Sequence, residues 1–137
     1  MRLAEVSTAT LSARLIVARL DAADLTFADL FEARLTNASL RGAMLSDANL
    51  HGATLLRADM SGATGERTNL TRASMRTANL SDAVLRGADF FQADLVDADL
   101  SRADLGFSRL SAAKLFNVKA TDTKFEGAIM PDNTVHP

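Results

Sequence analysis

Small and apolar residues recur along this chain in a five-residue cycle that keeps one phase through most of its length. Counted at every fifth position from Leu15 to Leu115, the central residue is leucine at 17 of 21 positions. The residue two places before each centre is alanine at 19 of 21 positions. A period this strict indicates a repeat architecture, in which every quintet adopts the same local conformation.

Neither of the common amphipathic elements accommodates this cycle. An α-helix turns once in about 3.6 residues, so a five-residue period would carry the leucines around the whole cylinder. A strand that alternates strictly has a period of two. The cycle fits a short extended segment whose alanine and leucine both point inward, followed by two residues that turn a corner. Each quintet then forms one side of a coil, and coils stack through backbone hydrogen bonds about 4.8 Å apart.

Charged residues indicate how many quintets make one coil. The residues just before the centres run through four acids and then four bases: Asp89, Asp94, Asp99, Asp104, Arg109, Lys114, Lys119 and Lys124. A coil of twenty residues sets each of these acids beside one base, and opposite charges on adjacent strands favour that register. Three quintets per coil would set Asp89 beside Asp104, and five would set Asp104 beside Ile129. We therefore predict four quintets per coil.

The quintets of residues 78–105, most of them Ala-Asp-Leu or Ala-Asn-Leu followed by two variable residues, resemble those of the pentapeptide-repeat family. The resemblance spans residues 13–130 and implies an all-β fold, a right-handed quadrilateral parallel β-helix. About six coils are expected. The closing stretch, residues 127–132, also resembles the ends of several cyanobacterial members of that family.

The cycle divides the chain into three expected parts. Residues 1–12 keep an echo of it that is one residue out of phase, which predicts a lead-in or cap over the N-terminal end. Residues 13–132 form the pentapeptide-repeat β-helix. Residues 133–137 follow Pro131, which ends the strand pattern, and form a C-terminal tail.

The composition is that of a folded protein, and it excludes the chemistry that depends on cysteine. Of the 137 residues, 47% are apolar and 23% are charged, and the net charge of −2 is too small to indicate a nucleic-acid partner. Without cysteine there is no disulfide, thiolate metal site or thiol nucleophile. The first twenty residues resemble neither a signal peptide nor a membrane span, so we expect a cytoplasmic location.

No catalytic or ligand-binding constellation can be assembled from the polar residues. The densest carboxylates occupy outward or corner positions of the repeat, where Asp suits solvent and turns: Asp94, Asp97, Asp99 and Asp104. His51 and His136 lack partners at metal-ligand spacing. We therefore expect no catalytic residue, no metal site and no cofactor.

The repeat is broken at one centre, Gly65, and the nearby Thr68 replaces an alanine. Losing a leucine from a stacked core would leave a cavity that costs roughly 2–5 kcal/mol unless neighbours fill it. Two interpretations stay open here. The break is either a bulge or small binding notch, or a tolerated irregularity into which Leu56 or Met60 repacks.

Apolar residues at outward positions serve no purpose in the repeat core and therefore indicate an interaction surface. Under the twenty-residue register they fall with arginine along the two edges of one face. The candidate surface comprises Phe31, Leu56, Arg76, Phe91, Val96 and Phe116. Phenylalanine with arginine is typical of protein interfaces, whereas the alternative interpretation is a scatter of ordinary surface apolar residues.

These features favour a non-enzymatic structural or interaction protein, a rigid rod that presents a face to an unidentified protein partner. A monomer, or a homodimer joined through the C-terminal end, is expected, with no direct nucleic-acid binding and no membrane association. The family resemblance implies an alternative, because some members are DNA mimics that inhibit or protect DNA gyrase, a type II topoisomerase. Such mimicry needs a long acidic rod, whereas this chain has a slight net charge and a basic ring in its last full coil.

Overall fold

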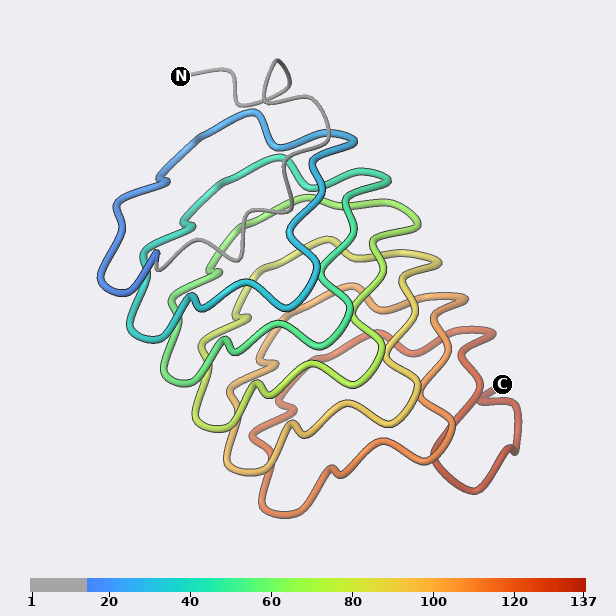
Figure 1. The fold of residues 1–137 in the computed structure, drawn as a ribbon. Coiled ribbons are helices and arrows are strands. Elements are labelled where there is room, and N and C mark those ends of the chain that lie inside the picture. Colours follow the sequence, from blue (N-terminus) through green and yellow to red (C-terminus); the bar gives the residue numbers. More distant parts are fainter. Residues whose placement is uncertain (1–14) are drawn as a thin grey trace.

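A computed structural model describes residues 15–137, in which the chain winds into a stack of similar coils (Figure 1). Adjacent coils are joined by parallel bridges between single residues. Each parallel bridge joins a residue to the one twenty positions later, from Arg19 with Ser39 to Arg109 with Ile129. Four quintets therefore complete one coil, as the charge pattern predicted. The lead-in predicted for residues 1–12 lies outside the described residues.

The coils contain neither helices nor long strands. Among residues 15–137, the backbone alternates two-residue turns with single bridged residues, the first at Arg19 and the last parallel one at Ile129. The bridged residue is the one just before each centre. Both of its neighbours, the alanine and the central leucine, point inward, as the sequence predicted.

The interior consists of stacked leucine and alanine side chains. From Leu25 to Leu110 every central residue is buried, including Met60, Met75 and Phe90. The N–H of Leu95 donates to the carbonyl oxygen of Lys114 at 3.0 Å, which places Leu95 beneath Leu115 in the next coil. Burial of a leucine-sized side chain stabilises a fold by about 1.5–3 kcal/mol, so this ladder is the main source of stability.

Every corner contains a residue with left-handed backbone. The second residue after each centre, from Val17 to Gly127, has φ between +52° and +67°, yet only five of these positions are glycine. Two backbone hydrogen bonds hold most corners. The N–H of Ala43, for example, donates to the Leu40 carbonyl at 3.0 Å, and that of Gly42 donates to the Ser61 carbonyl in the next coil at 2.9 Å. These bonds explain how residues that rarely adopt this conformation are accommodated.

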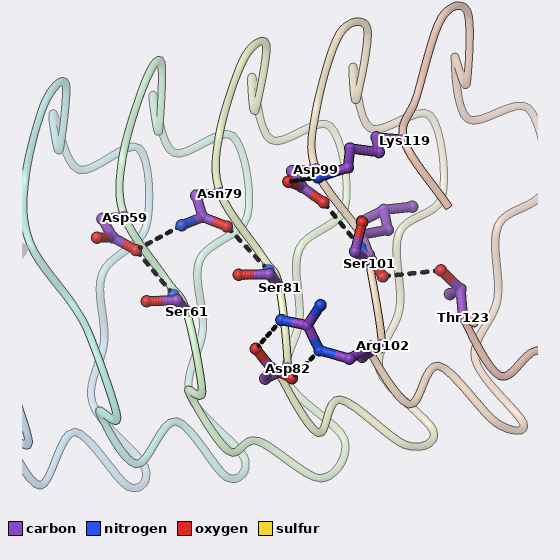
Figure 2. A network of polar contacts seen from close by, with 11 residues as sticks. Asp59, Ser61, Asn79, Ser81, Asp82, Asp99, Ser101, Arg102, Lys119 and Thr123 are labelled. Atoms are coloured by element: carbon purple, nitrogen blue, oxygen red, sulfur yellow. Dashed lines mark hydrogen bonds and ion pairs between the residues drawn. The ribbon is translucent and has the colours of Figure 1, made fainter. Parts of the chain in front are cut away.

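Asp and Asn side chains at the position before the centre form hydrogen bonds on the outside of the coils, both within a coil and between adjacent coils (Figure 2). Each carboxylate or amide oxygen can accept the N–H two residues later, as Asn79 does from Ser81 at 3.0 Å. Many also bond across coils, as where Asn79 Nδ2 donates to Asp59 Oδ1 at 3.2 Å. This double use explains why these two residue types recur at the position before the centre.

The C-terminal tail turns back on the last coil. The turn hydrogen bonds lengthen to 3.5 Å at Val118 and 3.4 Å at Thr123, where these residues replace alanine. Ile129 then forms an antiparallel bridge with Val135, and the Met130 N–H donates to the Thr134 carbonyl at 2.7 Å. Residues 133–137 therefore continue the hydrogen bonding of one side of the rod instead of projecting from it.

Candidate interaction face

The twenty-residue register sorts the outward side chains onto four faces, two of which lie on opposite sides of the coil and are compared below. Face A, with its two corners, comprises residues 31–37, 51–57, 71–77, 91–97 and 111–117. Face C comprises residues 21–27, 41–47, 61–67, 81–87, 101–107 and 121–127. On each face, residues twenty apart lie one above the other in a column.

One corner column of face A brings together four of the six predicted surface residues. The N–H groups of Arg57, Thr77 and Asp97 donate to carbonyls of the next coil at 3.0–3.1 Å. These acceptors belong in turn to Arg76, Val96 and Phe116, which stacks Leu56, Arg76, Val96 and Phe116 in consecutive coils. Phe116 is 77% exposed, Arg76 is exposed, and Leu56 and Val96 are half-buried.

The same column begins with Ile16, which is 40% exposed and which the sequence reasoning did not select. The N–H of Val17 donates to the carbonyl of Thr36 at 3.0 Å, which sets Ile16 one coil below Thr36. Its signal was present in the sequence, because Ile16 lies forty residues before Leu56, a whole number of coils.

The other edge of face A is less available than the sequence suggested. Phe31 and Phe91 are half-buried, and each ring is covered by a neighbour. The Phe31 ring stacks on the His51 ring, with centroids 5.4 Å apart and planes 4° apart. The guanidinium carbon of Arg109 lies 4.2 Å from the Phe91 centroid. These two aromatic residues therefore stabilise the column they stand in and expose only part of their rings.

Face C carries exposed apolar residues that the sequence reasoning did not select. Met44 and Val84 are 43% and 41% exposed, at the outward position before a centre. Phe27 and Phe107, at a corner of this face, are 74% and 58% exposed but stand four coils apart. Thr64 separates Met44 from Val84. The exposed apolar residues of face C are thus interrupted, whereas the face A column is apolar in three of the four consecutive coils from Leu56 to Phe116.

The break at Gly65 is an exchange of side-chain size inside the core. Thr68 is fully buried, and its hydroxyl donates to the carbonyls of Leu45 at 2.9 Å and Gly65 at 3.0 Å. A Cβ placed on Gly65 would lie 2.2 Å from that hydroxyl. The bridges from Met44 to Thr64 and from Thr64 to Val84 continue past the break, so there is no bulge. Thr68 therefore occupies part of the space that a leucine at this centre would take, and side-chain carbons of Leu45 and Leu85 also lie within 3.1 Å of that Cβ position.

The predicted charge pairs form in half of the cases. Arg109 Nη1 lies 3.3 Å from Asp89 Oδ2, and Lys119 Nζ lies 3.0 Å from Asp99 Oδ2. Asp94 and Asp104 instead contact the corner arginines Arg76, at 3.5 Å, and Arg86, at 3.0 Å. The longer arginine side chains reach these carboxylates from a corner, which the register alone does not reveal. All of these pairs are partly exposed, so each contributes only modestly to stability.

Asp99 is the most strongly perturbed carboxyl. The Ser101 hydroxyl contributes most to lowering its pKa to about 2, followed by the Ser101 backbone N–H and the Lys119 ammonium, against the opposing effect of burial. The hydroxyl lies outside hydrogen-bonding geometry, so the N–H contact of 2.9 Å is the better-defined one. A lowered pKa keeps this carboxylate charged, which suits a structural role and not a general acid.

Residues 15–137 contain no pocket and no group of three or more His, Asp or Glu side chains arranged to hold a metal ion. No helix that could cross a membrane is present in the same range. His51 Nδ1 lies 2.6 Å from the Thr71 hydroxyl, which is a structural contact.

A family model described as Pentapeptide repeats, in eight copies, matches residues 23–62, 43–82, 58–95 and 93–130. The chain belongs to the pentapeptide-repeat family. The resemblance inferred from the quintets is thus confirmed, and the fold is a β-helix type of solenoid, as in other pentapeptide-repeat proteins. No curated protein matches the chain.

Solved structures of pentapeptide-repeat proteins share the fold. Rfr23 from the cyanobacterium Cyanothece 51142 is 29% identical with a TM-score of 0.64, and the match covers 72% of this chain and 64% of Rfr23. The protein alr5209 from Nostoc PCC 7120 is 31% identical with a TM-score of 0.55, covering 80% and 74%. A trypsin-treated variant of QnrB1, a plasmid-mediated fluoroquinolone resistance protein, is 16% identical with a TM-score of 0.74, covering 82% and 57%. The chain thus spans less than two thirds of Rfr23 and QnrB1, and the QnrB1 match shows a common fold only.

Proposed function

We propose that this pentapeptide-repeat protein is a non-enzymatic interaction protein, a right-handed quadrilateral β-helix of about six coils whose face A binds a protein partner. One observation carries the proposal. Leu56, Arg76, Val96 and Phe116 stand in consecutive coils along one corner, and three of the four are apolar. An apolar strip rimmed by polar residues is a marker of protein–protein contact.

The architecture supports a binding role in a second way. Leucine and alanine fill the interior, so substitutions at outward positions leave the core intact. Cross-coil hydrogen bonds also fix the corner backbone before any partner arrives. A preordered surface loses little conformational entropy on binding, which favours affinity. We place this interaction in the cytoplasm.

The experiment that tests the proposal compares matched surface variants. The immobilised triple variant Leu56→Ser/Val96→Ser/Phe116→Ser should lose the partner that the parent protein captures from a lysate of the source organism. The control Met44→Ser/Val84→Ser changes two exposed apolar residues of face C and should retain it. Circular dichroism and thermal unfolding establish that both variants fold. Equal capture by the parent protein and the triple variant would refute face A as the binding surface.

The hypothesis of gyrase inhibition by DNA mimicry is the alternative. A DNA mimic presents carboxylates along its length, whereas the last full coil here carries a base on each of its four sides: Arg109, Lys114, Lys119 and Lys124. We therefore expect the purified protein at micromolar concentration to leave gyrase supercoiling unchanged. A dose-dependent loss of supercoiling would favour the alternative over face A.

We propose a monomer or a homodimer joined through the C-terminal end. Leu115, Phe125 and Met130 are only partly buried in the last coil, in contrast with the buried centres of the coils before it. A dimer would cover these side chains, and its stability would then depend on them. Light scattering coupled to gel filtration distinguishes the two states, and Phe125→Ser should convert a dimer to a monomer.

A further inference from the structure

Two arginines at opposite corners of face A are held in place without being neutralised. Arg57 Nε donates to Asn37 Oδ1 at 3.0 Å, and Arg72 Nε donates to Gln92 Oε1 at 3.0 Å. Both acceptors are neutral amides that belong to an adjacent coil. Within the described residues, the terminal guanidinium nitrogens of these two arginines have no hydrogen-bond partner. Each guanidinium is therefore oriented and still carries its full charge.

The corners of face C use arginine differently. Arg67 donates through Nε and Nη2 to the two carboxylate oxygens of Asp47 at 2.8 Å, and Arg102 does the same to Asp82 at 2.6 Å. All four arginines occupy the left-handed corner position and contact a residue twenty positions away. Only the acceptor differs, a carboxylate on face C and an amide on face A. Arg67 and Arg102 of face C are thus engaged in ion pairs, whereas Arg57 and Arg72 of face A remain available to a ligand.

A third arginine lies between these two corners. Arg34 is exposed, and no carboxylate of residues 15–137 forms an ion pair with it. It bridges Thr54, which in turn bridges Ser74, so a column of short side chains separates Arg57 from Arg72. Short side chains between long cationic ones leave room for a ligand to approach the guanidinium groups.

The charge of the whole face agrees with this arrangement. Face A carries five cations and three carboxylates, a net charge of +2, whereas face C carries five cations and eight carboxylates, a net charge of −3. Two of the three carboxylates on face A are already engaged. Asp94 lies 3.5 Å from Arg76, and Asp97 accepts a hydrogen bond from Asn117 at 2.7 Å. The third, Glu32, is exposed beside Arg34 at the N-terminal margin of the face.

We infer that the partner of face A presents carboxylates, and that Arg34, Arg57 and Arg72 bind an acidic protein surface there. The inference rests on the proposed function and specifies its partner. Guanidinium binds carboxylate through paired, charge-assisted hydrogen bonds. The adjacent column of Leu56, Val96 and Phe116 favours a protein over a nucleic acid, because a phosphate backbone offers nothing apolar to cover it.

Nuclear magnetic resonance of the arginine side chains tests this inference without knowledge of the partner. The probe is a hexaglutamate peptide, with hexaglutamine and a 16-base-pair DNA duplex as comparisons. Hexaglutamate should shift the Nε–Hε resonances of Arg57 and Arg72 and leave those of Arg67 and Arg102 in place, and hexaglutamine should shift none. Absent shifts, equal shifts of all four arginines, or tighter binding of the duplex would each overturn the inference.

A pair of charge-matched variants measures the effect. Arg57→Gln/Arg72→Gln should weaken hexaglutamate binding about tenfold or more, since two charge-assisted contacts are lost. Arg67→Gln/Arg102→Gln removes the same charge from the same kind of corner and should change the affinity less than twofold. Equal weakening by the two variants would show a response to net charge alone and contradict the assignment.

The apolar triple variant separates this inference from the proposed function. Leu56→Ser/Val96→Ser/Phe116→Ser should still bind hexaglutamate, because its arginines are intact. If hexaglutamate fails to bind while the triple variant loses its partner, the inference of an acidic partner is wrong, and the proposal that face A binds a protein is retained. If hexaglutamate binds at Arg57 and Arg72 while the triple variant captures its partner normally, the arginine site stands and the apolar strip is wrong.

Discussion

Residue size at two buried positions explains how the repeat survives its one broken centre. Gly65 and Thr68 exchange the usual roles, since the centre is small and the residue at the alanine position is large. The Thr68 hydroxyl is satisfied by two backbone carbonyls, so its burial leaves no unpaired polar group. The exchange maintains packing without a pocket and gives the irregularity a structural purpose.

A double-mutant cycle tests this exchange. Gly65→Leu alone overpacks the space that Thr68 occupies, and Thr68→Ala alone opens a gap and removes two hydrogen bonds. Each change should lower the free energy of unfolding by about 1–3 kcal/mol. The double variant restores the ordinary leucine and alanine pair and should lose much less than the sum. Urea denaturation measures all four proteins, and additive losses would show that the two residues are not coupled.

The left-handed corners allow a second test at single residues. Gly87 has φ of +66°, and a Cβ placed there would meet no atom within 4 Å, so Gly87→Ala introduces backbone strain and no clash. We expect a loss of about 1–2 kcal/mol. Ala112 has φ of +56°, and Ala112→Gly should raise stability by up to about 1 kcal/mol. Changes of the same sign in the two proteins, measured by chemical denaturation, would contradict this explanation.

At the scale of the quintet, the sequence predicted the inward pair, the two-residue corner and the register. It did not predict the left-handed backbone, because 18 of the 23 corner positions from Val17 to Gly127 hold residues other than glycine. Nor did it predict the pairing of Val135 with Ile129, since the tail contains no quintet. The contacts of His51 with Phe31 and of Arg109 with Phe91 were not predicted either. The period determines the position of each Cα on the coil, but not which neighbouring side chain packs against it.

Acid should weaken the contacts between quintets. The pKa of Asp99 is lowered to about 2, chiefly by Ser101 and then by Lys119, and Arg67 and Arg102 lower the pKa values of Asp47 and Asp82. A carboxyl whose pKa is lower in the folded state stabilises the fold above its unfolded value, here 3.8, and this contribution is lost as the pH falls through the folded value. The unfolding midpoint should therefore be flat from about pH 7 to 5 and fall between about pH 4 and 2.

Asp99→Asn provides the control for this pH dependence. The amide cannot titrate, so the variant should start from a lower midpoint at neutral pH and lose less of it on acidification. Thermal unfolding followed by circular dichroism at a series of pH values compares the two proteins. Parallel curves for the parent and Asp99→Asn would exclude a contribution from this carboxyl.

At the scale of the whole molecule, the coil assigns different tasks to different surfaces. The inside provides stability through stacked leucines, and the arginines of face C close ion pairs between coils. Face A retains unneutralised arginines beside an apolar column. This difference between faces A and C could be predicted only in part from the sequence. The register identifies the face on which each arginine lies, but not whether that arginine pairs with a carboxylate or with an amide.

Every assignment of a residue to a face depends on the twenty-residue register, which disulfide formation tests directly because the chain has no cysteine of its own. Thr64→Cys/Val84→Cys replaces a bridged pair and should oxidise rapidly to an intramolecular disulfide, since neighbouring strands lie within disulfide reach. Thr64→Cys/Asn79→Cys places the thiols fifteen residues apart, on different faces, and should remain reduced under the same conditions. Rapid closure of the second pair and not the first would contradict the four-quintet coil and the surfaces built on it.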